Sequence, residues 1–187
     1  MFIQTETTPN PATLKFLPGE TVLGAGTADF PTPEGAAASP LARRIFAVPG
    51  VTGVFLGSDF VTVTKSDGAI WDQIKPSILG AIMDHFQSGD PVMAGAATAP
   101  PGGGHAAHDG PDAEIVGQIK ELLDTRVRPA VAQDGGDIVY RGYRDGRLFL
   151  AMQGACAGCP SSAVTLKRGV ENLIRHYVPE VETVEAV

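Results

Sequence analysis

The chain has 187 residues, 43% of them apolar and 19% charged, which excludes global disorder and allows one ordinary domain or two small ones. Its formal net charge is −7, with 14 basic against 21 acidic residues, and only 6% of residues are aromatic. This balance excludes nucleic acid as the main partner, and two cysteines are too few for a disulfide scaffold.

No segment has the composition of a membrane span or a secretion signal. The longest uncharged stretch, residues 148–166, is interrupted by Gly, Pro, Gln and Ser, so it fails as an apolar span. The first ten residues, MFIQTETTPN, have no basic start and no apolar run. We therefore expect no membrane partner and a cytoplasmic, bacterial protein, or one of the mitochondrial matrix if the chain is a mature organellar form.

Residues 1–90 predict a small α+β domain. NPATLKFLPG is an extended pattern, and Ser39–Pro40 opens a short helical one. The runs VTGVFLG and FVTVTK predict two strands with a tight turn at residues 58–59. Apolar residues at steps of four then predict a helix that ends before Gly89: Ile70, Ile74, Ile78, Ile82 and Phe86.

Residues 91–110 predict a flexible linker. Ala, Gly and Pro occupy 14 of these 20 positions, and no apolar periodicity is present. The segment carries His105 and His108, which we interpret as solvated linker residues in preference to metal ligands.

Residues 111–187 predict a second α+β domain in the order α-β-β-α-β. An apolar stripe predicts a helix from about Asp112 to Ala132, and QDGGDI predicts a turn in preference to a calcium or phosphate loop. Two strands follow, joined by a hairpin turn at Asp145–Gly146. A helix from Pro160 to Tyr177 and a strand in VETVEAV complete the domain.

The chemistry of the chain is concentrated in GACAGCPSS, where Cys156 and Cys159 form a C-x-x-C between a strand and a helix. Pro160 suits the first helical position, so Cys159 is predicted at or beside the N-cap. The helix N-terminus favours a thiolate, and the flanking small residues predict exposed thiols.

Ligand number separates the possible uses of the pair. A tetrahedral zinc or a 4Fe-4S cluster needs about four protein ligands, and one chain offers two thiols and four scattered histidines. Two chains could complete the set across a two-fold axis, and such a shared site is expected to be labile.

Three alternatives stay open on these residues: a dithiol–disulfide oxidoreductase, an intersubunit zinc site, and a pair of buried structural thiols. Against the oxidoreductase, no Trp precedes the pair, the lone Trp71 lies in the other half, and the proline follows the second cysteine.

The stretch from GACAGCPSS to the end, with the preceding VRPAVAQDGGDIVYRGYRDGRLFLAMQG, resembles the NifU-like C-terminal domain of the Nfu iron–sulfur scaffold and carrier proteins. The segments NPATLKFLPG and SPLARRIFAVPGVTGVFLGSDFVTVTK resemble the separate N-terminal domain of that family.

The resemblance implies a carrier or scaffold and not an enzyme. It implies that Cys156 and Cys159 ligate an iron–sulfur cluster, 4Fe-4S, bridging a homodimer. It further implies that the cluster comes from upstream assembly factors and passes to apo-proteins that need it. We expect the N-terminal domain, which has no ligand set of its own, to serve in partner recognition or in access to the cluster.

Overall fold

The computed structural model describes residues 1–95, 105–107, 110–158 and 160–187. The chain forms two compact units, residues 1–103 and 104–187, and each contains helices and a β-sheet of its own. The predicted α+β class with two small domains is confirmed.

The N-terminal unit is a five-stranded antiparallel sheet in the order β1-β2-β5-β4-β3. A short 3₁₀ helix, η1 (Gly35–Ala38), precedes α1 (Pro40–Phe46), and α2 (Trp71–Ser88) follows the last strand. The strands are β1 (Gln4–Thr7), β2 (Thr13–Leu17), β3 (Ala28–Phe30), β4 (Val51–Leu56) and β5 (Val61–Lys65).

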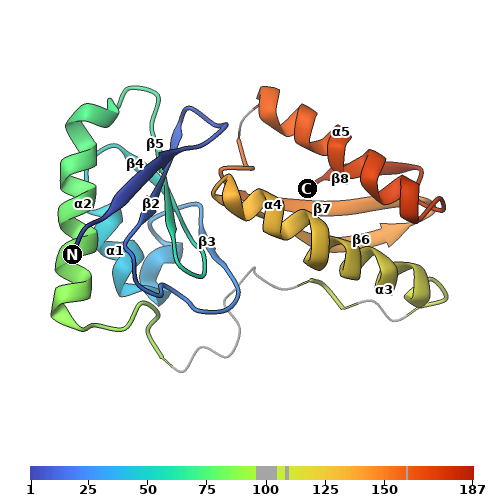
Figure 1. The fold of residues 1–187 in the computed structure, drawn as a ribbon, viewed down its shortest axis with the longest axis horizontal. Helices are drawn as coiled ribbons and strands as arrows, with labels where there is room; N and C mark the ends of the chain where they lie inside the picture. Colours follow the sequence, from blue (N-terminus) through green and yellow to red (C-terminus); the bar gives the residue numbers. More distant parts are fainter. Residues whose placement is uncertain (96–104, 108–109, 159) are drawn as a thin grey trace. The chain divides into compact units, whose positions relative to one another are not determined.

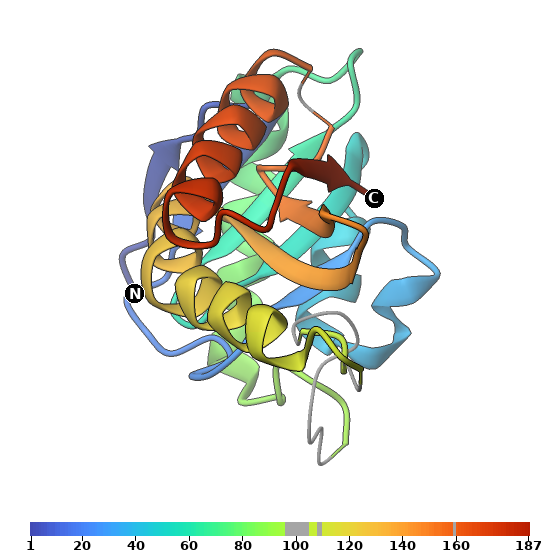
Figure 2. The same ribbon diagram turned by 90° about the vertical axis from the view of Figure 1, so that its right-hand side faces the viewer.

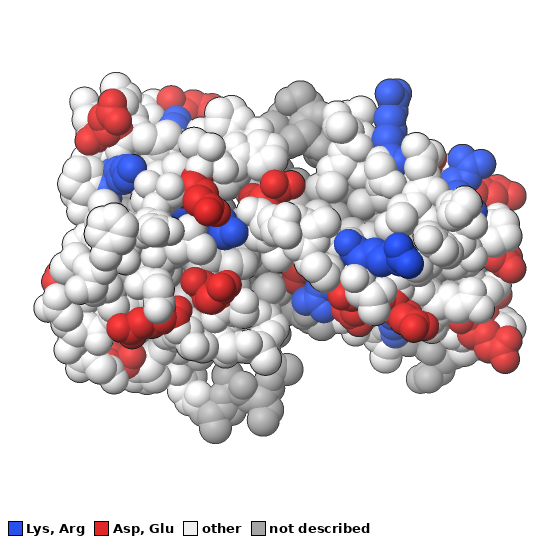
Figure 3. Space-filling view, in the orientation of Figure 1, with Lys and Arg blue, Asp and Glu red and all other residues white. Residues whose placement is uncertain are grey.

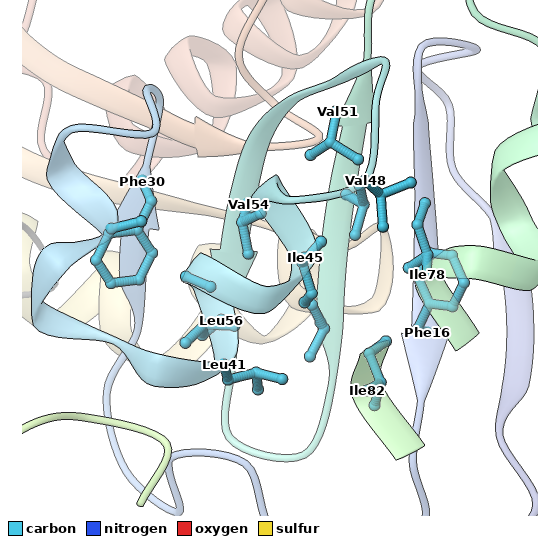
Figure 4. Packing of buried hydrophobic residues seen from close by; sticks show 14 of the residues in the cluster. Phe16, Phe30, Leu41, Ile45, Val48, Val51, Val54, Leu56, Ile78 and Ile82 are labelled. Atoms are coloured by element: carbon cyan, nitrogen blue, oxygen red, sulfur yellow. The ribbon is translucent and has the colours of Figure 1, made fainter. Parts of the chain in front are cut away.

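One apolar core joins α1 and α2 to this sheet. Figure 4 shows side chains of both helices meeting those of the strands, and each of the following is at most 2% exposed: Phe16, Phe30, Leu41, Ile45, Val54, Leu56, Ile78 and Ile82. The apolar periodicity read from the sequence therefore identified the buried face of each helix.

Two helix boundaries show how local sequence sets the ends of elements. Ser39 caps α1, because its Oγ accepts a hydrogen bond from the Ala42 amide (3.1 Å) and Pro40 takes the first helical position. α2 begins one residue after Ile70, which is extended and 54% exposed, and it ends at Gly89 with φ 71°. Ile70 is thus outside the core that the stripe predicted.

The first described residues of the predicted linker are attached to the N-terminal unit. The Ser39 hydroxyl donates to the Val92 carbonyl (2.6 Å), and the Ala94 amide donates to the Ala38 carbonyl (2.8 Å). Val92 and Met93 also pack against the core of this unit. The chain therefore leaves the N-terminal core after these contacts.

The C-terminal unit is a three-stranded sheet in the order β6-β7-β8, covered by helices on one face (Figures 1 and 2). β6 and β7 are antiparallel, and β7 and β8 are parallel. The predicted order of helix, two strands, helix and strand is found. The strands are β6 (Gly136–Arg144), β7 (Arg147–Gly154) and β8 (Thr183–Ala186), and α5 (Pro160–Tyr177) connects the last two.

The helix predicted over residues 112–132 is interrupted by a π-helical turn. It consists of α3 (Ala113–Leu122), the π-helical η2 (Leu123–Val127) and α4 (Arg128–Gln133). Ile119, Leu123, Val127 and Val131 are buried at steps of four, which is wider than the 3.6 residues of an α-helical turn. Local widening keeps all four on the core, and Pro129, which lacks an amide hydrogen, suits the site of the disruption.

The surface carries both signs of charge. On the face shown in Figure 3, basic and acidic side chains occur on each unit, and neither unit presents a continuous basic surface there. Within the part of the chain that the structure describes, no helix has the length and apolarity needed to cross a bilayer.

Candidate functional site

The cysteine loop lies between the end of β7 and the start of α5, as the sequence predicted. Gly154 and Gly158 both have positive φ (61° and 75°), which few other residues tolerate. The Cys156 amide donates to the Gln153 carbonyl (3.3 Å), and the Ala157 amide donates to the Gly154 carbonyl (3.1 Å). These bonds close a tight turn immediately after the strand.

Cys156 is buried, with 5% of its surface exposed, and it belongs to the apolar core of the C-terminal unit. Burial, followed by the negative charges of Asp134 and Asp137, raises the pKa of the Cys156 thiol to about 12. The expectation that both thiols are exposed is therefore wrong for Cys156. Because the loop turns this side chain toward the core, desolvation decides its protonation, and at neutral pH it is a thiol.

Cys159 is outside the described residues, and the predicted N-cap position of Cys159 stays a prediction. α5 begins at Pro160, which agrees with the helix start that the sequence indicated.

The segment between α4 and β6, Gly135 and Gly136, packs against the core-facing side of the cysteine loop. The Ala155 amide donates to the Gly135 carbonyl (3.1 Å). A Cβ built on Gly136 would lie 2.5 Å from the Cys156 Sγ and 2.7 Å from the Gln153 carbonyl oxygen, so only glycine fits there. The predicted turn in QDGGDI is present as a tight segment around Gly135, which has φ 80°.

An ion pair between a partly exposed arginine and a buried aspartate fixes the start of β6 beside this segment. The Arg128 Nε and Nη2 donate to the two carboxylate oxygens of Asp137, each over 2.8 Å. The Asp137 side chain is 3% exposed, and its Oδ1 also accepts from the Ile138 amide (2.8 Å). The hydrogen bonds to Asp137 raise the pKa of Arg128, so its guanidinium stays protonated.

The same guanidinium continues the network outward. Arg128 Nη1 donates to Asp124 Oδ1 (2.9 Å), which also lies 3.0 Å from His105 Nε2. Although partial burial favours its neutral form, the hydrogen bonds from Arg128 and His105 lower the pKa of Asp124. Four side chains thus form one chain of charge-assisted contacts.

His105 is held in place, and its interpretation as a solvated linker residue is wrong. Its side chain is 9% exposed, and its Nδ1 accepts a hydrogen bond from the Tyr140 amide (2.8 Å). The Ala106 amide donates to the Tyr140 carbonyl (2.9 Å). β6 is an edge strand, so residues 105–107 occupy its open edge as a neighbouring strand would. His108 is outside the described residues.

Burial lowers the pKa of His105, although the charge of Asp124 acts in the opposite direction. An accepting Nδ1 and a donating Nε2 require the neutral ring. The geometry and the pKa therefore agree on a neutral His105 that donates to Asp124.

Among the described residues, no three His, Cys, Asp or Glu side chains form a group that could hold a metal ion. Cys156 is thus not part of such a group within the described residues of its own chain.

No motif in the sequence indicated the network from His105 to Asp137. The nearest signals were Pro129 inside a helical stripe and a second carboxylate in QDGGDI.

Comparison with protein families supports the resemblance found in the sequence. Residues 3–89 match the family described as scaffold protein Nfu/NifU N terminal, and residues 119–185 match the NifU-like domain. Together the two matches cover most of the chain.

Curated relatives extend over both units. A Drosophila erecta protein named NFU1 iron-sulfur cluster scaffold homolog, mitochondrial, is 56% identical over 100% of this chain, which spans 65% of that relative's length. The human protein of the same name is 52% identical over 100% of this chain, which spans 72% of the human protein's length. A solution structure of a NifU-like protein from Saccharomyces cerevisiae is 31% identical over 50% of this chain and 85% of its own, with a TM-score of 0.44.

Proposed function

Since the chain belongs to the Nfu and NifU-like family of iron–sulfur cluster scaffold proteins, we propose that it binds an iron–sulfur cluster between two subunits and transfers it to apo-proteins. The cluster is cargo, and the protein is a carrier and not an enzyme. The observation that carries the proposal is the loop with Cys156 and Cys159 at the end of β7.

We propose Cys156 and Cys159 as the ligands. Two thiolates from each of two chains supply the four ligands of a 4Fe-4S cluster. In support, no group of three or more His, Cys, Asp or Glu side chains that could hold a metal ion is found among the described residues. A homodimer is thus part of the proposal, and its formation depends on cluster loading.

Transfer proceeds by ligand exchange at iron. A recipient thiol loses its proton and its sulfur bonds to iron as the bond from iron to Cys156 or Cys159 breaks, and that proton passes to the departing sulfur. Upstream assembly factors and apo-proteins that need the cluster are the partners of this reaction.

The burial of Cys156 argues against a dithiol–disulfide oxidoreductase in which Cys156 attacks, because a disulfide substrate must reach the attacking sulfur and Cys156 is 5% exposed. An intersubunit zinc site uses the same four thiolates and is the remaining alternative.

The compartment is part of the proposal. Named relatives are mitochondrial and give no support to a bacterial cytoplasm, so we place the protein in the mitochondrial matrix, where a dithiol stays reduced.

Anaerobic reconstitution with iron and sulfide tests the proposal. We expect one 4Fe-4S cluster per two chains by iron analysis and Mössbauer spectra, and a shift from monomer to dimer in sedimentation. Cys156→Ser and Cys159→Ser should each abolish stable loading. Ala157→Ser places a hydroxyl at an exposed position of the same loop and serves as the control, with loading retained. A monomer that holds a complete cluster contradicts the shared site.

A further inference from the structure

Cys156 can act on a cargo only if its loop changes arrangement. Its sulfur faces the core beside Gly136, and 5% of the residue is exposed. An external ligand needs access to that sulfur. The arrangement described for residues 155–158 is therefore a closed one, and what holds it closed controls access to the thiol.

The start of β6 holds the closed arrangement from one side. Gly136 pairs in register with Gly154, and Asp137 pairs with Gln153, whose carbonyl accepts from the Cys156 amide. Displacement of the cysteine loop from the core thus requires movement of the start of β6 or loss of its pairing with the end of β7.

Arg128 fixes the start of β6, and Arg128 is in turn fixed by Asp124. The guanidinium reaches Asp137 with two hydrogen bonds and Asp124 with a third. Arg128 follows the π-helical turn, so its backbone position depends on that local widening. Asp124 is half-exposed and joins this inner pair to the surface of the domain.

His105 completes the connection to the segment between the two units. Its ring contacts Asp124 through Nε2 and the Tyr140 amide through Nδ1, and residue 106 is bonded to Tyr140 as well. Residues 105–107 thus connect the path toward the N-terminal unit with the side chains that support the cysteine loop.

We infer that His105 and Asp124 are positioning residues for the cysteine loop: through Arg128 and Asp137 they hold the arrangement that buries Cys156, and release of residues 105–107 frees the thiol. This role rests on the proposed function, in which the loop presents Cys156 to a cluster.

Alkylation of Cys156 in the full chain, without a cluster, tests the inference. In a Cys159→Ser background Cys156 is the only thiol, and intact mass gives its rate of reaction with iodoacetamide at one fixed pH. We expect His105→Ala and Asp124→Asn each to raise this rate about tenfold, which corresponds to about 1.4 kcal/mol, because each change removes one charge-assisted hydrogen bond from the network.

Matched controls remove similar groups outside the network. Glu121→Gln removes an exposed carboxylate on α3, and His176→Ala removes an exposed imidazole on α5. Both should alkylate at the rate of the parent. Rates for His105→Ala and Asp124→Asn that equal those of the controls would overturn the inference.

The double variant His105→Ala/Asp124→Asn separates coupling from independent effects. If the two residues act through one path, the double variant alkylates no faster than the faster single variant. A rate increase in the double variant that equals the product of the two single increases would overturn the shared path between His105 and Asp124. Asp124→Glu, which keeps the carboxylate, should return the rate toward that of the parent.

Urea unfolding of each variant distinguishes positioning from general stability. If His105 and Asp124 position the loop, the alkylation rate without urea exceeds the rate expected from the globally unfolded fraction of each variant. An alkylation rate that equals this expected rate in every variant overturns the inference. No cluster takes part in this assay. A negative alkylation result would therefore leave the cluster stoichiometry measured by reconstitution valid. A failed reconstitution would likewise leave the alkylation rates interpretable.

Discussion

Arg128 holds Asp137 by two hydrogen bonds of 2.8 Å, and the carboxylate is almost completely removed from water beside the cysteine loop. An ion pair with a buried carboxylate contributes little net stability when intact, but loss of the arginine leaves the buried charge of Asp137 without compensation. The pair is therefore a constraint on the position of β6.

Arg128→Gln should be strongly destabilising for this reason. We expect a loss of about 3–5 kcal/mol in the free energy of unfolding of the C-terminal unit, measured by urea denaturation followed by circular dichroism. Arg147→Gln is the control, because its ion pair with Glu185 spans 3.8 Å and both side chains are exposed. The control should lose at most about 1 kcal/mol. Equal losses in the two variants would contradict the assigned role of Arg128.

Gly136→Ala should disrupt the cysteine loop by sterics alone. The new Cβ meets the Cys156 Sγ, the Gln153 carbonyl and the Cys156 amide at 2.5–2.9 Å, and two of these atoms are backbone. We expect a loss of roughly 2–3 kcal/mol, as for other overpacked sites. Gly117→Ala in α3 has nothing within 4 Å and should instead gain about 0.5–1 kcal/mol from helix propensity. Retention of full stability by Gly136→Ala would show that Cys156 and Gln153 can move to make room for the new methyl group.

The secondary structure was predictable because its signals are local. Asp145–Gly146 has the positive φ values (50° and 75°) that the hairpin turn requires, and the step of four in α2 marked its buried face. β3 was missed, since three residues are too few to show a period.

The environment of the candidate site was less predictable, because it depends on contacts between distant residues. His105 meets Tyr140 across 35 positions, and nothing in an Ala- and Gly-rich segment indicates such a contact. Cys156 is buried because its loop packs against Gly136. The small residues that flank Cys156 are compatible with burial as well as with exposure, so they did not predict either one. C-x-x-C spacing identified the residues, and the fold determines their protonation.

His85 should make the N-terminal unit sensitive to acid. It is completely buried, and neither ring nitrogen has a hydrogen-bond partner in the part of the chain that the structure describes. Burial and then the charge of Arg44 lower the pKa of His85, while Asp90 acts in the opposite direction. A lowered pKa in the fold means that the stability contribution is present above the ordinary value of about 6.5 and is lost as pH falls through the folded value.

Trp71, the only tryptophan, lies at the start of α2 and reports on this unit by fluorescence. We expect the urea midpoint of the parent to fall between pH 7 and pH 5, and that of His85→Leu to fall less. His176→Leu, at an exposed position on α5, should follow the parent. A parent and a His85→Leu variant with parallel pH profiles would contradict protonation of His85 as the cause.

Two fragments test how far the C-terminal unit extends. A fragment of residues 112–187 contains every helix and strand of the unit but lacks the contacts of His105 and Ala106, whereas one of residues 104–187 keeps them. The shorter fragment loses one hydrogen bond to Asp124 and two to the edge of β6, all partly exposed to water. We expect it to fold with a free energy of unfolding about 1–3 kcal/mol lower, by urea denaturation. His105→Ala in the longer fragment should produce part of that loss, and His176→Ala none of it.

Amide exchange at Tyr140 should accelerate in the shorter fragment and in His105→Ala, because the acceptor of that amide is the His105 ring. Equal stability of the two fragments, with unchanged exchange at Tyr140, would mean that residues 105–107 do not hold the edge of β6 in solution.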